Sequence, residues 1–177
     1  FDLLVIGSGI GGLSAALEAA DRGFEVAVLS KADSLEETNT AWAQGGIVGS
    51  AAEDSPELLY RDIMEAGAQM NSAEAVRLVA REGPPLVDDF LRRKVGVPFS
   101  LGADGRPDLT MEAAHSLRRI YHYRDHTGRA IEDALLSRAL ANPRVTTFVD
   151  HTVIELITNT HNSTDPAERY RPTHVIG

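Results

Sequence analysis

The chain contains no cysteine, which excludes disulfide bonds, thiolate metal sites and thiol nucleophiles. No apolar run reaches the length that a membrane-spanning helix needs. Positive charge is also scarce: 17 basic residues face 26 acidic ones, for a formal net charge of −9. Nucleic acids and anionic membranes both require clustered cations, so we expect neither as a partner. These absences predict a soluble, cytoplasmic protein.

A glycine-rich fingerprint lies near the start of the chain. The apolar run 3–6 is typical of a buried parallel strand, apolar residues recur at helical spacing over 13–20, and a second strand is predicted over 24–29. Strand, turn, helix and strand form the context that G-x-G-x-x-G needs to bind a dinucleotide. We therefore predict an α/β, Rossmann-like fold with a parallel sheet. Free amides and the positive end of the helix would hold the diphosphate at Gly7, Ser8, Gly9, Ile10, Gly11 and Gly12.

The second strand departs from the usual pattern at its end. An acid normally stands there and binds the adenosine ribose. Here the strand runs into Ser30 and Lys31, and Glu25 lies too early to replace the acid. The serine hydroxyl can bond the ribose, whereas the lysine can bind the extra phosphate of NADP. This position therefore leaves both kinds of cofactor open.

A second pair of glycines follows in the segment 39–47, and paired glycines let the main chain approach a large flat group. With Ser30 and Lys31, this segment resembles the flavin-binding region of the succinate dehydrogenase, fumarate reductase and L-aspartate oxidase superfamily. Relatives with a covalent flavin carry the attached histidine where this chain has Asn39, which has no nucleophile for the bond. The resemblance therefore implies a non-covalent FAD. It implies contacts from Asn39, Thr40, Ala41, Trp42, Ala43, Gln44, Gly45, Gly46 and Val153.

A third segment points to one branch of that superfamily. Residues 109–122 are similar to the L-aspartate oxidase stretch LTxEGGHSxxRIxH, and residues 125–129 to the D-x-T-G start of a helix. The resemblance implies that Glu112 lies at the substrate and helps to distinguish aspartate from a plain dicarboxylate, and a carboxylate is a natural partner for an ammonium group. Ala113 and Ala114 replace two glycines that are frequent in the family, which removes backbone freedom. The alternative is an ordinary surface acid near a helix start.

The resemblance covers residues 1 to about 157. It implies FAD-dependent oxidation of L-aspartate to iminosuccinate, with electrons passing to oxygen or fumarate. The product would feed quinolinate and NAD biosynthesis, which implies a functional link to quinolinate synthase. Three alternatives remain: a soluble fumarate reductase or succinate dehydrogenase-type flavoprotein, an NADP-dependent reductase, and a non-catalytic flavin-binding module.

Several other side chains allow two interpretations. His122 and His126 have the spacing of a metal pair on a helix, but H-E-x-x-H and cysteine are both missing, so we predict no metal site. Arg118 and Arg119 either bind a substrate carboxylate or face solvent and neighbouring acids. Trp42 either covers the flavin or packs in the core, and we favour a position near the ring.

The expected organisation is a dinucleotide-binding βαβ unit over 1–31, a flavin-contact loop over 32–50, a helical insertion over 54–141 and strands within 145–177. Helices are predicted to start near Ser55 and after Ser72, to break at 83–85 before a third helix, and to resume over 129–141. Strands are predicted over 145–149, 153–158 and 174–177, with polar loops over 100–108 and 160–172. Family members are longer, so we expect a capping domain, the main catalytic arginine and the rest of the flavin domain outside these 177 residues. Alone, they should be inactive.

Overall fold

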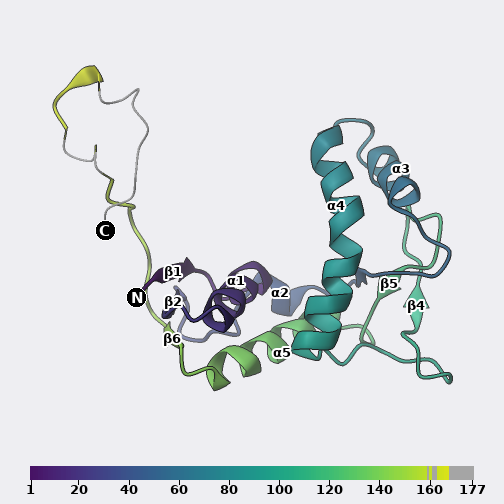
Figure 1. Cartoon of the computed structure of the whole chain (residues 1–177), viewed down its shortest axis with the longest axis horizontal. Helices are drawn as coiled ribbons and strands as arrows, with labels where there is room; N and C mark the ends of the chain where they lie inside the picture. Colours follow the sequence, from purple (N-terminus) through teal and green to yellow (C-terminus); the bar gives the residue numbers. More distant parts are fainter. Residues whose placement is uncertain (159, 161–162, 168–177) are drawn as a thin grey trace.

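The computed structural model describes residues 1–158, 160 and 163–167. Its helices and strands are β1 (Leu3–Ile6), α1 (Ile10–Asp21), β2 (Val26–Leu29), α2 (Asn39–Trp42), β3 (Ile47–Val48), α3 (Pro56–Ala66), α4 (Ala73–Leu86), the π-helix η1 (Val87–Val95), β4 (Leu109–Thr110), β5 (Ile120–Tyr121), α5 (Thr127–Ala141) and β6 (Val145–Phe148). In Figure 1 the strands β1, β2 and β6 lie left of centre, where the chain leaves towards its C-terminal segment, and the helices α3 and α4 lie on the right. Helix α5 runs from β6 towards the lower end of α4.

The first sheet is parallel and has the order β1-β2-β6. Val26 of β2 pairs with Leu3 on one side and Val145 on the other. Helices α1 and α5 pack against these strands and against each other. This confirms the predicted α/β fold with a parallel sheet, although β2 begins at Val26, two residues later than expected.

Helix α1 forms where the apolar spacing predicts it. Of its four buried side chains, Ala16 and Ala20 pack with apolar residues of the parallel sheet, whereas Leu13 and Leu17 join the core cluster that includes side chains of α5 and η1. The helix ends at Asp21, and Gly23 adopts a positive φ of +94°, a conformation that favours glycine.

The helices of the insertion begin at the predicted serines. The Ser55 hydroxyl accepts a hydrogen bond from Leu58 N at 3.2 Å, and the Ser72 hydroxyl accepts one from Ala75 N at 3.4 Å. The predicted break at residues 83–85 is wrong, because α4 includes Pro84 and Pro85 and continues directly into η1. Each proline removes one amide donor, and the chain changes to the wider π-helical turn just after them instead of ending.

The segment 54–141 is not wholly helical. Strands β3, β5 and β4 form a second, antiparallel sheet in which Ile47 and Leu109 both pair with Tyr121. Helix α5 starts at Thr127, two residues before the predicted start, and ends at Ala141 as predicted. It packs on the parallel sheet and leads into β6, so it belongs to that layer rather than to an insertion.

The end of the described chain differs most from expectation. Residues 153–157 are not a strand, and Ile154 is 93% exposed. An apolar run becomes a strand only when a neighbour satisfies its backbone, and these five residues pair with no described strand. The predicted strand 174–177 and most of the loop 160–172 lie outside the described residues. Within the described part of the chain, no helix has the length and apolar character required to span a membrane.

Candidate functional site

The glycine-rich turn joins β1 to α1 in a conformation that only glycines permit. Gly7 has a φ of +103°, and its amide donates to Leu29 O at 2.8 Å. A Cβ on Gly12 would lie 1.9 Å from Gly7 O, so the close approach of the helix to the strand requires glycine there. The N-cap residue of α1 is Gly9, which has no side chain to cap the helix, and the first turn carries no acid. The Gly11 and Gly12 amides therefore remain available for an anion.

A cavity of about 520 Å³ opens above this turn. It collects eleven of the predicted cofactor residues: Gly7, Ser8, Gly9, Ile10, Gly11, Gly12, Ser30, Lys31, Asn39, Thr40 and Val153. It also includes residues that the sequence did not single out, namely Glu37, Thr38, His151 and Thr152. The predicted contacts Ala41, Trp42 and Ala43 line neither this cavity nor the one described next. The structure thus brings the start of the second motif, Asn39 and Thr40, beside the glycine-rich turn in one groove suited to a dinucleotide.

Two contacts hold the motifs together. Ile10 N, in the first turn of α1, donates to Thr40 Oγ1 at 3.0 Å. Ser8 is buried, and its hydroxyl donates to Leu35 O at 2.8 Å in the loop that follows β2. Both contacts stabilise the loop against the glycine-rich turn.

The end of β2 lacks an acid, as the sequence indicates, but the cavity does contain one. Ser30 is buried, and its hydroxyl accepts a hydrogen bond from Ala32 N at 3.3 Å and donates to Ser34 O at 3.3 Å, so it serves its own loop. Lys31 is exposed. Glu37 is the single carboxylate among the described residues that line this cavity. It is the natural group to accept hydrogen bonds from ribose hydroxyls in place of the missing acid.

The second glycine pair meets the third motif in a cavity of about 300 Å³. Its lining comprises Gln44, Gly45, Gly46, Asp108, Leu109, Thr110, Glu112, Arg118, His122 and Arg124. Gly46 N donates to Glu112 Oε1 at 3.1 Å across 66 residues of sequence. A Cβ on Gly46 would lie 2.1 Å from Ile120 Cγ2, so this position also requires glycine. Two carboxylates, Asp108 and Glu112, and two guanidinium groups thus surround the turn, a charge pattern suited to a substrate with both signs of charge.

Helix α5 supports the segment that links the two cavities. Gly128 N donates to Ala43 O at 3.0 Å, and a Cβ on Gly128 would lie 2.0 Å from Thr40 O. Trp42 is 79% exposed, so it does not pack in the core of the described structure. Its predicted place beside the ring stays a prediction.

Glu132, one turn further along α5, is the buried group that sequence reasoning missed. Its residue exposure is 0%, and neither carboxylate oxygen has a hydrogen-bond partner. Burial raises the pKa of Glu132 to about 7; Asp133 and Glu36 add to this effect, whereas Thr38 and Arg129 oppose it. The sequence offered one signal for it: Glu132 lies four residues after Gly128, which places both residues on one face of the predicted helix.

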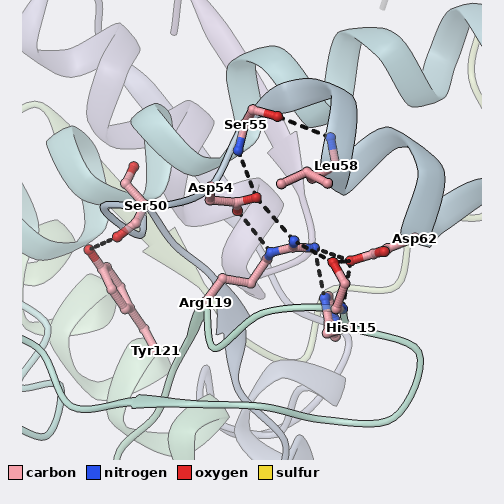
Figure 2. Close-up of polar contacts among 9 residues, drawn as sticks. Ser50, Asp54, Ser55, Leu58, Asp62, His115, Arg119 and Tyr121 are labelled. Atoms are coloured by element: carbon pink, nitrogen blue, oxygen red, sulfur yellow. Dashed lines mark hydrogen bonds and ion pairs between the residues drawn. The ribbon is translucent and has the colours of Figure 1, made fainter.

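The two arginines of the third motif have different surroundings. Arg118 is exposed and lines the smaller cavity, whereas Arg119 is 0% exposed and lies among acids. Figure 2 shows its guanidinium between Asp54 and Asp62, with His115 beside it. Arg119 Nη1 donates to Asp62 Oδ2 at 2.6 Å, and Nη2 donates to Asp54 Oδ1 at 3.0 Å. Two alternatives were predicted for Arg119, a substrate carboxylate or solvent and neighbouring acids, and the structure shows neighbouring acids.

The acid Asp62 receives several donors at one oxygen. Ser116 donates to Oδ2 from both its amide and its hydroxyl, each at 2.9 Å. Burial alone would raise the pKa of Asp62, but these bonds and Arg119 outweigh it and hold that pKa below its usual range. Asp62 therefore stays ionised opposite the guanidinium.

The two histidines with the spacing of a metal pair, for which no metal site was predicted, have separate partners. His122 Nε2 lies 3.5 Å from Asp108 Oδ2, and His126 Nδ1 lies 2.8 Å from Asp125 Oδ1. Among the residues that the structure describes, no three potential ligands gather around a metal position.

Comparison with known proteins gives a consistent result. Residues 2–171 match the FAD binding domain family. A curated L-aspartate oxidase of Nicotiana tabacum is 43% identical over 164 residues, which cover 92% of this chain and 25% of that protein. L-aspartate oxidase of Halobacterium salinarum is 41% identical over 158 residues, covering 89% of this chain and 30% of that protein. The chain thus spans about a quarter of the length of the tobacco relative.

Solved structures extend the likeness to the fold. A quinol fumarate reductase of E. coli superposes with a TM-score of 0.82 at 25% identity, covering 89% of this chain and 27% of that chain. The Sdh1 complex of Mycobacterium smegmatis gives a TM-score of 0.80 at 28% identity, covering 88% of this chain and 28% of that chain.

Proposed function

The chain belongs to the FAD binding domain family, and we propose that it forms the flavin-binding part of an L-aspartate oxidase. The proposal depends above all on one observation: the hydrogen bond of 3.1 Å from Gly46 N to Glu112 Oε1. It brings the glycine pair that the resemblance assigns to the flavin against the acid that the resemblance assigns to the substrate. The relatives at 41–43% identity, which carry the name L-aspartate oxidase, support it.

The groups that line the larger cavity suit FAD in their chemistry. The Gly11 and Gly12 amides in the first turn of α1 would bind the diphosphate, and Glu37 would accept hydrogen bonds from the adenosine ribose. The crowded glycines of the turn let the backbone approach the cofactor. Asn39 lines the same cavity and has no group for a covalent bond, so we propose that the FAD is non-covalent.

Substrate would bind in the smaller cavity beside the flavin turn. Glu112 would bind the ammonium group of aspartate, and Arg118 and Arg124 are placed to attract its carboxylates. FAD, when bound, supplies the redox chemistry by accepting hydride from the substrate. The residues of this chain would orient the reacting C–H bond and exclude water.

The wider reaction follows from the same proposal. Aspartate would become iminosuccinate, electrons would pass to oxygen or fumarate, and the product would supply quinolinate synthase in NAD biosynthesis. A cytoplasmic location is part of the proposal and is supported by composition. The name of the tobacco relative places that protein in the chloroplast.

A second candidate is a fumarate reductase or succinate dehydrogenase-type flavoprotein. The TM-scores of 0.80 and 0.82 with such structures favour it at the level of the fold. The higher identity of the aspartate oxidases over the same residues favours the first candidate.

The test is an anaerobic flavin absorbance spectrum of the complete polypeptide, recorded before and after L-aspartate, with succinate as the alternative substrate. We expect aspartate to bleach the flavin and succinate to leave it unchanged. Glu112→Gln should weaken aspartate binding about tenfold, because a charge-assisted hydrogen bond is lost. The exposed variant Glu82→Gln is the matched control. Bleaching by succinate alone would replace the first candidate by the second.

A further inference from the structure

We propose that Arg119, Asp62 and Ser116 form a clamp that positions Glu112 for recognition of the substrate's ammonium group. The inference rests on the proposed function, since it assigns a task to residues behind the acid that would read the substrate. Arg119 is a positioning residue in this view, although the sequence equally allows it to bind a substrate carboxylate.

The guanidinium of Arg119 cannot reach a substrate. Its side chain is 0% exposed, and it lines neither cavity. Its Nε lies 2.8 Å from Asp54 Oδ2, Nη2 donates to Asp54 Oδ1, and Nη1 donates to Asp62 Oδ2. The side chains of Asp54 and Asp62 are themselves only 9% and 12% exposed. These buried charges hold the three side chains in one arrangement, because any other arrangement would leave a buried charge without an opposite partner.

Arg119 joins three parts of the fold. Asp62 lies within α3, and Asp54 lies just before that helix, where it also accepts from Ser55 N at 2.8 Å (Figure 2). The backbone carbonyl of Arg119 accepts from Gly49 N at 2.8 Å, directly after β3. The segment just after β3, the loop of the third motif and helix α3 therefore meet at one residue.

The loop that carries Glu112 connects β4 to Ser116, and Ser116 belongs to the clamp. Ser116 is bound twice to Asp62 Oδ2, and His115 N donates to Glu112 O at 3.2 Å. His115 Nδ1 lies 3.3 Å from Arg119 Nη1, and because arginine only donates, that nitrogen is the acceptor. Only residues 113–115 separate Glu112 from the clamped serine. This short connection sets the place of the Glu112 carboxylate beside Gly46.

The backbone conformation of Ala114 means that the connection over residues 113–115 needs contacts from neighbouring residues to stay in place. Ala114 has a φ of +67°, a left-handed conformation that is unfavourable for alanine. Contacts on both sides must hold it, and the clamp supplies them on the C-terminal side. Loosening the clamp should therefore let the loop relax and move Glu112 away from Gly46.

The experiment uses the complete, FAD-loaded polypeptide and the perturbation of the flavin spectrum by anaerobic titration. Dissociation constants for aspartate and for succinate give a preference ratio that does not depend on turnover. Ser116→Ala removes one donor to Asp62, and Arg119→Lys removes the planar fork that spans both acids. Each should lower the preference for aspartate by about tenfold while the affinity for succinate changes by less than about twofold. Arg93→Lys, in the exposed ion pair with Asp89, is the matched control for replacing an arginine by lysine.

A double variant separates positioning from general stability. If Ser116 acts through Glu112, adding Ser116→Ala to Glu112→Gln lowers the preference no further than Glu112→Gln alone. A multiplicative fall in the double variant would overturn the clamp, as would an unchanged preference in FAD-loaded Ser116→Ala. If Arg119→Lys gives no folded protein, Ser116→Ala decides the question.

The outcomes also distinguish this inference from the proposed function. Aspartate recognition by Glu112 fails if Glu112→Gln leaves the preference unchanged, and the clamp then fails with it. The clamp alone fails if Glu112→Gln lowers the preference and Ser116→Ala does not.

Discussion

Replacement of Glu132 by glutamine should remove a large part of the pH dependence of the protein's stability. Glu132 lies on α5 with 0% exposure and no hydrogen-bond partner for either oxygen. The charged neighbours that influence its pKa are Asp133 and Glu36, which raise it, and Arg129, which lowers it. Glutamine keeps the shape of the protonated acid and cannot ionise.

The magnitude follows from the difference between the folded and unfolded pKa values. Burial raises the pKa of Glu132 from 4.5 to about 7, so the folded protein keeps a proton that the unfolded chain loses. The stabilising contribution is therefore fully present below pH 4.5 and is lost as the pH rises through about 7. A shift of this size, at about 1.4 kcal/mol per unit, corresponds to roughly 3 kcal/mol.

The assay is chemical unfolding of the complete polypeptide, followed by circular dichroism at about pH 5 and about pH 8. Between these values the parent protein should lose about 2.5 kcal/mol more of its free energy of unfolding than Glu132→Gln does, because part of the contribution is already lost at about pH 5. Glu82→Gln, an exposed acid paired with Arg81, should behave like the parent. Equal losses in the parent and in Glu132→Gln would refute the conclusion that Glu132 is a neutral buried acid.

Two further substitutions test the cofactor cavity. Gly128→Ala should destabilise the protein by about 1–3 kcal/mol and weaken FAD binding, because its Cβ would lie 2.0 Å from Thr40 O. Gly83→Ala in α4, where the nearest atom is 3.8 Å away, is the helical control for thermal unfolding and should not destabilise the protein. Glu37→Gln should raise the dissociation constant of FAD about tenfold in a fluorescence titration, since one strong acceptor for the ribose is lost. An unchanged constant would remove Glu37 from the ribose site.

Local patterns predicted the parts of the structure that local interactions decide. The turn at Gly7–Gly12 follows from strand, glycine and helix signals within a short stretch, and the caps Ser55 and Ser72 follow from the adjoining helix. Each of these features depends on residues that are neighbours in sequence.

Contacts between residues far apart in sequence account for the differences between the predicted and the observed structure. Pro84 and Pro85 normally end a helix, yet here the chain continues as a π-helix that places Leu91 and Val95 in the core. Strands β3, β4 and β5 have two residues each, too few for a periodic pattern. Sequence also left open whether Arg119 binds a substrate carboxylate or faces solvent and neighbouring acids, because Asp54 and Asp62 lie more than fifty positions earlier.

The long sequence separation between contacting residues also matters while the chain is being synthesised. Strand β2 can pair with β1 as soon as the glycine-rich turn and α1 have formed. The other edge of β2 stays unpaired until β6 has been synthesised, because β2 pairs there with β6 and Val26 N donates to Arg144 O just before it. His151 and Val153 close the larger cavity only after that strand has arrived. On the ribosome, the glycine-rich turn is therefore ready long before the groove is complete, and capture of the cofactor becomes a late step of folding.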